Sequence, residues 1–180
     1  GSVIERSDRF EEACEILTML FSQDRTTFRG KYYELDEAPM EPKPLQNPLP
    51  LLIGGGGEKR TLRTVARFAT EWNCWGRPEE LRHKIGVLER HCEEVGRDPA
   101  EIQKSAVGVL MFAETEEKAA ELQENLGHRS GLVGTPAQLR QVVAEYAAVG
   151  VDELLVPDFA VSAGERNDHL DRFRAEVVDY

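Results

Sequence analysis

Four consecutive glycines, Gly54–Gly57, separate an apolar segment from a segment with helical periodicity. The apolar residues 50–53 are too few for a helix, whereas the residues after Glu58 repeat their apolar side chains at helical spacing. The predicted order is therefore strand, glycine loop and helix. A helix N-terminus carries partial positive charge, and glycines let a phosphate approach the backbone closely. This stretch predicts a site for an anionic ligand.

The charge balance argues against nucleic acid as a partner. Twenty-two Lys and Arg residues stand against 33 Asp and Glu residues, for a formal net charge of −11, which is a poor surface for a polyanion. The basic residues that depart from this balance follow the glycines directly: Lys59, Arg60, Arg63 and Arg67. We therefore expect a small anionic ligand, and regard a solvated helix face as the alternative for these four side chains.

Cysteine usage and hydropathy indicate the compartment. The chain has three cysteines, Cys14, Cys74 and Cys92. Their odd number argues against a disulfide framework, and their wide spacing argues against a metal site. No apolar run reaches the roughly 18 residues that span a bilayer, and the first residues lack the apolar core of a signal peptide. We expect a cytoplasmic protein with no membrane partner.

Short apolar strands alternate with amphipathic helices along the chain. We expect strands at 50–53 and 71–75, one within the apolar run 104–112 that Gly108 breaks, and one at 154–156, each followed by a helix. This order specifies an α/β fold of parallel strands with ligand loops at their carboxyl ends. Four strands form either a small open parallel sheet or half of an eight-stranded barrel, and the pattern alone does not choose between them.

Local signals predict the connecting elements. A first helix is expected from Asp8 to Phe21, with Asp8 and Glu11 as an N-cap pair. A hairpin around Gly30 and a proline-rich connector form an excursion over residues 26–49. Residues 128–134 are expected to be a loop, and Thr135 to Gln138 carry the signature of a capping box.

Several segments together resemble one known family. Residues 52–63, 66–69 and 72–73 are similar to the luciferase-like monooxygenases, especially those that use the deazaflavin coenzyme F420. Similar segments occur in the same order at 28–33, 42–46, 96–99 and 134–136, so the resemblance covers roughly residues 9–178. Family members are (β/α)8 TIM barrels. The resemblance implies that residues 1–180 form one partial-barrel domain, corresponding to the C-terminal half with strands five to eight.

The resemblance also implies positions for the coenzyme. Gly54, Gly55 and Gly56 would line its site after strand five, next to Gly57 of the anion loop. Cys74, Trp75, Gly76 and Arg77 would lie after strand six, near the ribityl phosphate. It assigns no catalytic residue and no metal site.

The implied activity is hydride transfer between F420, or alternatively FMN, and a small organic substrate, with the coenzyme carrying the chemistry. Because four parallel strands would leave open edges and an uncovered inner face, we expect a homodimer or a complementing N-terminal half-barrel. The alternative function is a non-catalytic half-barrel module that oligomerises or binds a phosphorylated ligand.

Each candidate residue also has a structural interpretation. The glycines could form a plain tight turn, Cys74 could be a buried apolar residue, and Arg77 could pair with Glu79 or Glu80. We expect Trp72 and Trp75 to share one strand face, where they would stack on a ring system or pack in the core. Asp158, after the last strand, would contact a ligand or cap a loop. The four histidines are expected to be structural or solvated.

Overall fold

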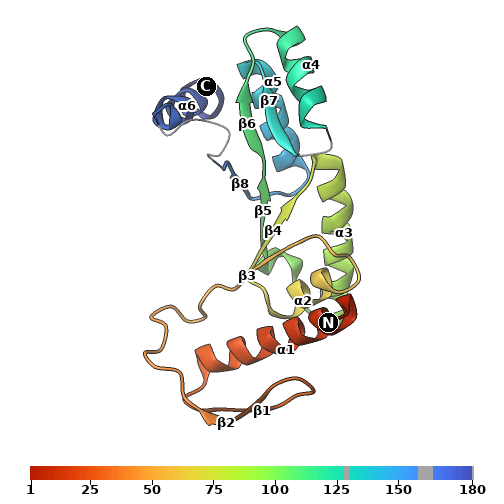
Figure 1. Cartoon of the computed structure of the whole chain (residues 1–180), viewed down its shortest axis with the longest axis vertical. Coiled ribbons are helices and arrows are strands. Elements are labelled where there is room, and N and C mark those ends of the chain that lie inside the picture. The colour runs from red at the N-terminus through yellow and green to blue at the C-terminus, as the bar shows by residue number, and fades with distance from the viewer. Residues whose placement is uncertain (128–129, 158–163, 180) are drawn as a thin grey trace. The chain divides into compact units, whose positions relative to one another are not determined.

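The computed structural model describes residues 1–127, 130–157 and 164–179 as an α/β chain (Figure 1). Its elements, in chain order, are α1 Val3–Ser22, β1 Thr26–Arg29, β2 Glu34–Ala38, β3 Leu52–Gly54, α2 Thr61–Phe68, β4 Glu71–Trp75, α3 Pro78–Val95, β5 Gln103–Val107, β6 Val109–Phe112, α4 Glu116–Leu126, β7 Gly131–Gly134, α5 Pro136–Ala148, β8 Glu153–Leu155 and α6 Arg166–Phe173. No helix in these ranges is both long enough and apolar enough to cross a membrane.

The sheet topology follows the predicted alternation of strands and helices. Strands β3, β4, β5 and β8 form one sheet in that order, and the described residues contain no closed barrel. Two compact units divide the chain: residues 1–72 with 87–102, and residues 73–86 with 103–180. Each unit is described by itself below, and a single partial-barrel domain over residues 1–180 stays a prediction.

In the first unit, α1 begins five residues before its predicted start. Ser2 is the N-cap, and its hydroxyl accepts the N–H of Glu5 at 3.1 Å. The prediction of Asp8 and Glu11 as an N-cap pair was therefore wrong, because Ser2 supplies the capping oxygen and both carboxylates lie within the helix.

The predicted hairpin is confirmed as the antiparallel pair β1–β2. Its turn is fastened to α1 by a single carboxylate, since Glu12 accepts the backbone N–H groups of Lys31, Tyr32 and Tyr33 at 2.8–3.1 Å. Burial alone would raise the pKa of Glu12, but the three hydrogen bonds together outweigh it and lower the pKa below its usual value. The excursion is thus tied to the helix that precedes it.

Apolar side chains at the predicted helical spacing make the core of this unit. Leu62, Val65 and Ala66 of α2 are fully buried, together with Ile53 of β3 and Trp72 of β4. Removing such surface from water supplies about 25 cal/mol per Å². The helix after the glycines is therefore held chiefly by its buried face.

In the second unit, the apolar run 104–112, within which one strand was expected, forms the two strands β5 and β6 on either side of Gly108. Before this residue β5 pairs in parallel with β8, in the register Ala106↔Leu154. After it β6 pairs in parallel with β7, in the register Leu110↔Leu132. A Cβ at Gly108 would lie 3.2 Å from the Leu132 side chain, so the change of partner coincides with a residue that allows close approach.

Strand β7 corrects the prediction of a loop over 128–134. Residues 128–129 lie outside the described residues, but Gly131–Gly134 is a strand with Leu132 and Val133 buried. A Cβ at Gly131 would lie 2.3 Å from the Leu126 side chain. The glycines that suggested a loop instead permit a close approach between strand and helix.

The capping box that opens α5 is confirmed. The Thr135 hydroxyl accepts the N–H of Gln138 at 3.4 Å, and Gln138 Oε1 accepts the N–H of Thr135 at 3.0 Å. The helix buries Leu139 and Tyr146 completely. Its local start signal and its buried face therefore agree.

Candidate functional site

The glycine loop joins β3 to α2 within the first unit. Gly55 adopts φ +120°, in a region that side chains rarely allow. The buried indole of Trp72 donates from Nε1 to the Gly55 carbonyl at 2.8 Å, and the N–H of Leu62 donates to the Gly57 carbonyl at 3.0 Å. A Cβ at Gly57 would lie 2.8 Å from Thr61 Oγ1. The backbone conformation therefore favours glycine at Gly55, and a side chain at Gly57 would require the Thr61 hydroxyl to move.

Replacing Gly55 by asparagine is expected to lower the free energy of unfolding by about 1–3 kcal/mol, because a φ near +120° lies outside the left-handed region that asparagine tolerates. Gly96 is the matched control. It adopts φ +71°, and no atom lies within 4 Å of the position that a Cβ would take, so Gly96→Asn should cost less than about 1 kcal/mol. Urea denaturation followed by far-ultraviolet circular dichroism measures both. Equal losses of unfolding free energy in the two variants would contradict the view that the backbone conformation at position 55 requires glycine.

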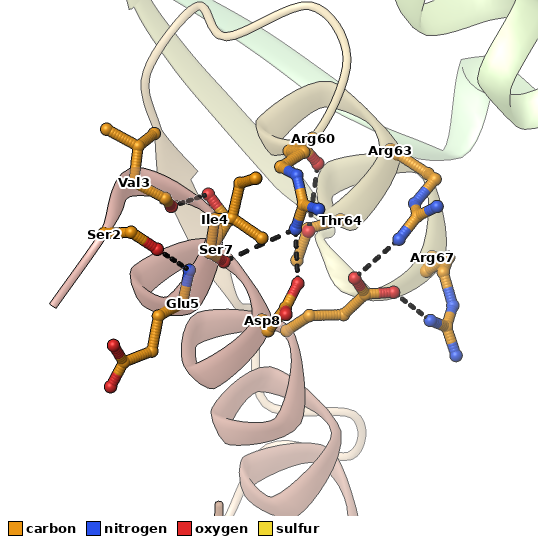
Figure 2. A network of polar contacts seen from close by, with 11 residues as sticks. Ser2, Val3, Ile4, Glu5, Ser7, Asp8, Arg60, Arg63, Thr64 and Arg67 are labelled. Atoms are coloured by element: carbon orange, nitrogen blue, oxygen red, sulfur yellow. Dashed lines mark hydrogen bonds and ion pairs between the residues drawn. The ribbon is translucent and has the colours of Figure 1, made fainter. Parts of the chain in front are cut away.

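The basic residues after the glycines contact α1 (Figure 2). Arg60 pairs with Asp8, whereas Glu11 binds Arg63 at 2.8 Å and also binds Arg67. The Arg60 hydrogen bond is the main reason that the pKa of Asp8 lies below its usual value. Three of the four cations expected near an anionic ligand are thus engaged by carboxylates of the first helix.

The second candidate segment, residues 74–77, lies in the other unit. Cys74 is buried, and burial raises the pKa of its thiol, which fits the interpretation as a buried apolar residue rather than a reactive nucleophile. The Gly76 carbonyl accepts the Tyr146 hydroxyl at 3.0 Å. The Arg77 guanidinium donates to the Gly127 carbonyl, while the Arg77 backbone N–H donates to Glu80 at 2.9 Å. Residues 76–77 therefore join the start of α3 to α4 and α5.

The prediction that Trp72 and Trp75 share a strand face was wrong. They are three residues apart, and successive side chains of a strand point to opposite faces. Trp72 is 1% exposed, whereas Trp75 is 49% exposed. Only Trp75 remains available for stacking on a ligand.

A polar pair on the strand face of Trp75 was not predicted from the sequence. The amide of Asn73 donates to Ser105 Oγ at 2.8 Å. Asn73 is one residue from each of the buried side chains Trp72 and Cys74, and this alternation was the available signal for its placement. The pair shows that the strand face of Trp75 carries polar as well as apolar groups.

A cleft of about 620 Å³ lies among α3, α4, β7 and α5 of the second unit. Arg77, Glu79, Glu124, Glu145 and Tyr146 are among its lining residues. The cleft thus includes one candidate residue, Arg77. Asp158, the remaining candidate, lies outside the described residues.

Metal ligation finds no support in the described ranges, where no group of three or more His, Cys, Asp and Glu side chains could hold a metal ion. His91 instead contacts the Glu58 carbonyl at 2.8 Å and Glu94 at 3.1 Å. The candidate site within these ranges is therefore a backbone loop with supporting side chains.

Comparison with known proteins identifies the family. The family model described as luciferase-like monooxygenase matches residues 3–126, which is more than half of the chain. The chain belongs to this family. The predicted family is therefore confirmed, and the curated relatives of the chain include flavin- and F420-dependent oxidoreductases.

Two relatives illustrate the range of coenzymes around this luciferase-like chain. The FMNH(2)-dependent dimethylsulfone monooxygenase of Pseudomonas fluorescens (strain Pf0-1) is 26% identical over 194 residues, covering 84% of this chain and 52% of the relative. The F420-dependent glucose-6-phosphate dehydrogenase of Kineococcus radiotolerans is 30% identical over 120 residues, covering 65% of this chain and 35% of the relative. The chain therefore spans about half the length, or less, of these curated relatives.

Solved structures confirm the fold class. An F420-dependent secondary alcohol dehydrogenase in complex with an F420-acetone adduct is similar with a TM-score of 0.79 and 22% identity, covering 99% of this chain and 63% of that one. The F420-dependent tetrahydromethanopterin reductase from Methanopyrus kandleri is similar with a TM-score of 0.78 and 15% identity. The match covers 96% of this chain and 63% of that one. At these identities the likeness concerns the fold alone, and it supports a partial TIM barrel.

Proposed function

We propose that this luciferase-like chain contributes a coenzyme-binding half to an oxidoreductase that transfers hydride between F420 and a small organic substrate. The observation that carries the proposal is the glycine loop, where Gly55 has a backbone conformation that side chains rarely adopt and a Cβ at Gly57 would displace the Thr61 hydroxyl. Such a loop lets a ligand approach the backbone. The family match over the same residues supports a coenzyme as that ligand.

The chain's own residues would bind and orient the coenzyme. Gly54–Gly57 would offer backbone N–H groups to its anionic part, and Cys74–Arg77 would contribute backbone groups and the Trp75 ring. When bound, the coenzyme supplies the hydride chemistry. We assign no proton-transfer role to a side chain of this sequence.

The choice of coenzyme is also a proposal. F420 is favoured by the sequence similarity around the glycines, and FMN is the alternative because a relative of similar identity uses FMNH(2). Arg60, Arg63 and Arg67 already pair with α1. We therefore assign the anion contact to the loop backbone rather than to these side chains.

A partner surface follows from the exposed face of the second unit. Trp75 and Leu155 are 49% and 38% exposed, and their registers place them on the same face as Asn73 and Ser105. Exposed apolar side chains on a sheet face are normally covered. We propose that a complementing N-terminal half-barrel covers this face, with a homodimer as the alternative.

Fluorescence titration of the purified chain with F420 and with FMN tests the proposal, both alone and with the N-terminal half of a relative added in trans. Saturable binding of one coenzyme, tightened by the added half, is the expected result. Sedimentation velocity on the same samples distinguishes a heteromeric complex from a homodimer. A folded chain that binds neither coenzyme under either condition would refute the oxidoreductase, and binding of inorganic phosphate alone would favour the non-catalytic module.

A further inference from the structure

We infer that Trp72 and His91 are positioning residues that fix the path of the glycine loop. Neither belongs to the loop, since Trp72 follows α2 on strand β4 and His91 lies on α3. The glycine loop, Trp72 and His91 all belong to the first unit. The consequence for coenzyme binding rests on the proposed function, whereas the effect on the loop itself does not.

Trp72 holds the first fixed point of the loop. Its ring is 1% exposed, and its Nε1 donates to the Gly55 carbonyl at 2.8 Å. In a trans peptide the C=O and the following N–H point in opposite directions. With the Gly55 carbonyl drawn toward the buried indole, the N–H of the next residue, Gly56, is directed away from the core.

His91 makes the second contact, to the carbonyl of Glu58, which lies three residues after Gly55. Its Nε2 lies 2.8 Å from the Glu58 carbonyl, which can only accept, so this nitrogen is the donor. The other ring nitrogen, Nδ1, lies 3.1 Å from the Glu94 carboxylate on the same helix. The imidazole therefore ties the end of the glycine run to α3, and the same peptide geometry directs the Lys59 N–H away from the ring.

The two contacts bracket the residues with the greatest backbone freedom. A chain of glycines loses more conformational entropy on becoming ordered than any other sequence. Fixing it in the free protein reduces what ligand binding must order, which raises affinity through preorganisation. We therefore expect the loss of either contact to loosen the loop and to weaken coenzyme binding.

His91 permits the sharper test because a conservative variant can retain its donor. His91→Leu removes the hydrogen bond, and His91→Gln places an amide N–H near the position of Nε2. Arg97→Gln is the matched control. Arg97 also bonds a backbone carbonyl of the first unit, that of Ala66 on α2 at 3.3 Å, and its side chain otherwise bonds Glu101 rather than a residue of the loop.

Two measurements are made on each variant of the full chain. Amide hydrogen exchange of peptides covering residues 54–60 reports the loop, and titration with F420 or FMN reports the coenzyme. A hydrogen bond is worth about 0.5–1.5 kcal/mol net, so exchange should quicken and the Kd should rise by about 2- to 10-fold in His91→Leu. His91→Gln should stay within about twofold of the wild type, and Arg97→Gln should leave loop exchange unchanged.

Unchanged loop exchange in His91→Leu would overturn the inference. So would a His91→Gln variant that behaves like His91→Leu, since the ring rather than its donor would then be required. Faster exchange with an unaltered Kd would remove the link to the coenzyme. If the wild-type chain binds neither coenzyme, the proposed function fails by itself, and hydrogen exchange still decides whether His91 positions the loop.

Discussion

Replacing Trp72 by alanine is expected to lower the free energy of unfolding by about 3–5 kcal/mol, the usual cost of removing a large buried aromatic side chain. The ring is almost completely buried and carries the hydrogen bond to Gly55. Folded domains have only about 5–15 kcal/mol of stability. The Trp72→Ala variant should therefore lose a large fraction of its folding stability. Urea denaturation followed by circular dichroism measures the change in midpoint.

Trp72→Phe separates the two contributions of this side chain. Phenylalanine retains much of the apolar volume but cannot donate to the Gly55 carbonyl, so it should cost distinctly less than alanine. A loss in Trp72→Ala below about 1 kcal/mol would mean that the site collapses without a cavity. It would contradict the view that β4 and the loop are held together by this ring.

Alkaline unfolding is expected to depend on Tyr146. Burial raises the pKa of its hydroxyl to about 12 from the usual 10.0. The unfolded chain therefore loses the proton before the folded chain does, and the associated stability is complete below about pH 10 and disappears as the pH rises toward 12. A shift of this size corresponds to about 2–3 kcal/mol. Equilibrium unfolding measured from about pH 8 to about pH 12 should show the decline.

Tyr146→Phe provides the comparison for this decline. It should be less stable at about pH 8, because the Gly76 carbonyl loses its donor, but it should decline less at higher pH. Cys14 contributes separately, since burial raises the pKa of its thiol to about 11 from 9.0. The stability that depends on the protonated thiol is lost as the pH rises between those two values. Parallel curves for the wild type and Tyr146→Phe above about pH 10 would rule out a contribution from this hydroxyl.

Periodicity was sufficient to predict most of the fold. The helix after the glycines, the hairpin and the capping box at Thr135 occur as expected, because each depends on residues close in sequence. The start of α1 was misplaced because the prediction considered only residues close in sequence. Asp8 resembles a cap locally, but its carboxylate bonds Arg60, 52 residues away, and no local pattern records such a pair.

The glycine loop between a strand and a helix was predicted, whereas the side chains that bond to it were not. The glycines themselves identify the loop, and the preference for glycine at Gly55 and Gly57 agrees with that expectation. What supports the loop could not be predicted, since Trp72 and His91 reach it from a later strand and a later helix. The contacts of Arg60, Arg63 and Arg67 were missed because a basic cluster looks the same in sequence whether it binds a ligand or another helix.

The change of strand partner at Gly108 has a consequence for the evolution of the second unit. Because β5 bonds to β8 before this glycine and β6 bonds to β7 after it, one continuous segment serves two independent ladders. Mutations that lengthen or shorten the α4–β7 region would affect the second ladder and leave the register of β5 with β8 intact. Related proteins could therefore vary in this region while inheriting the same sheet.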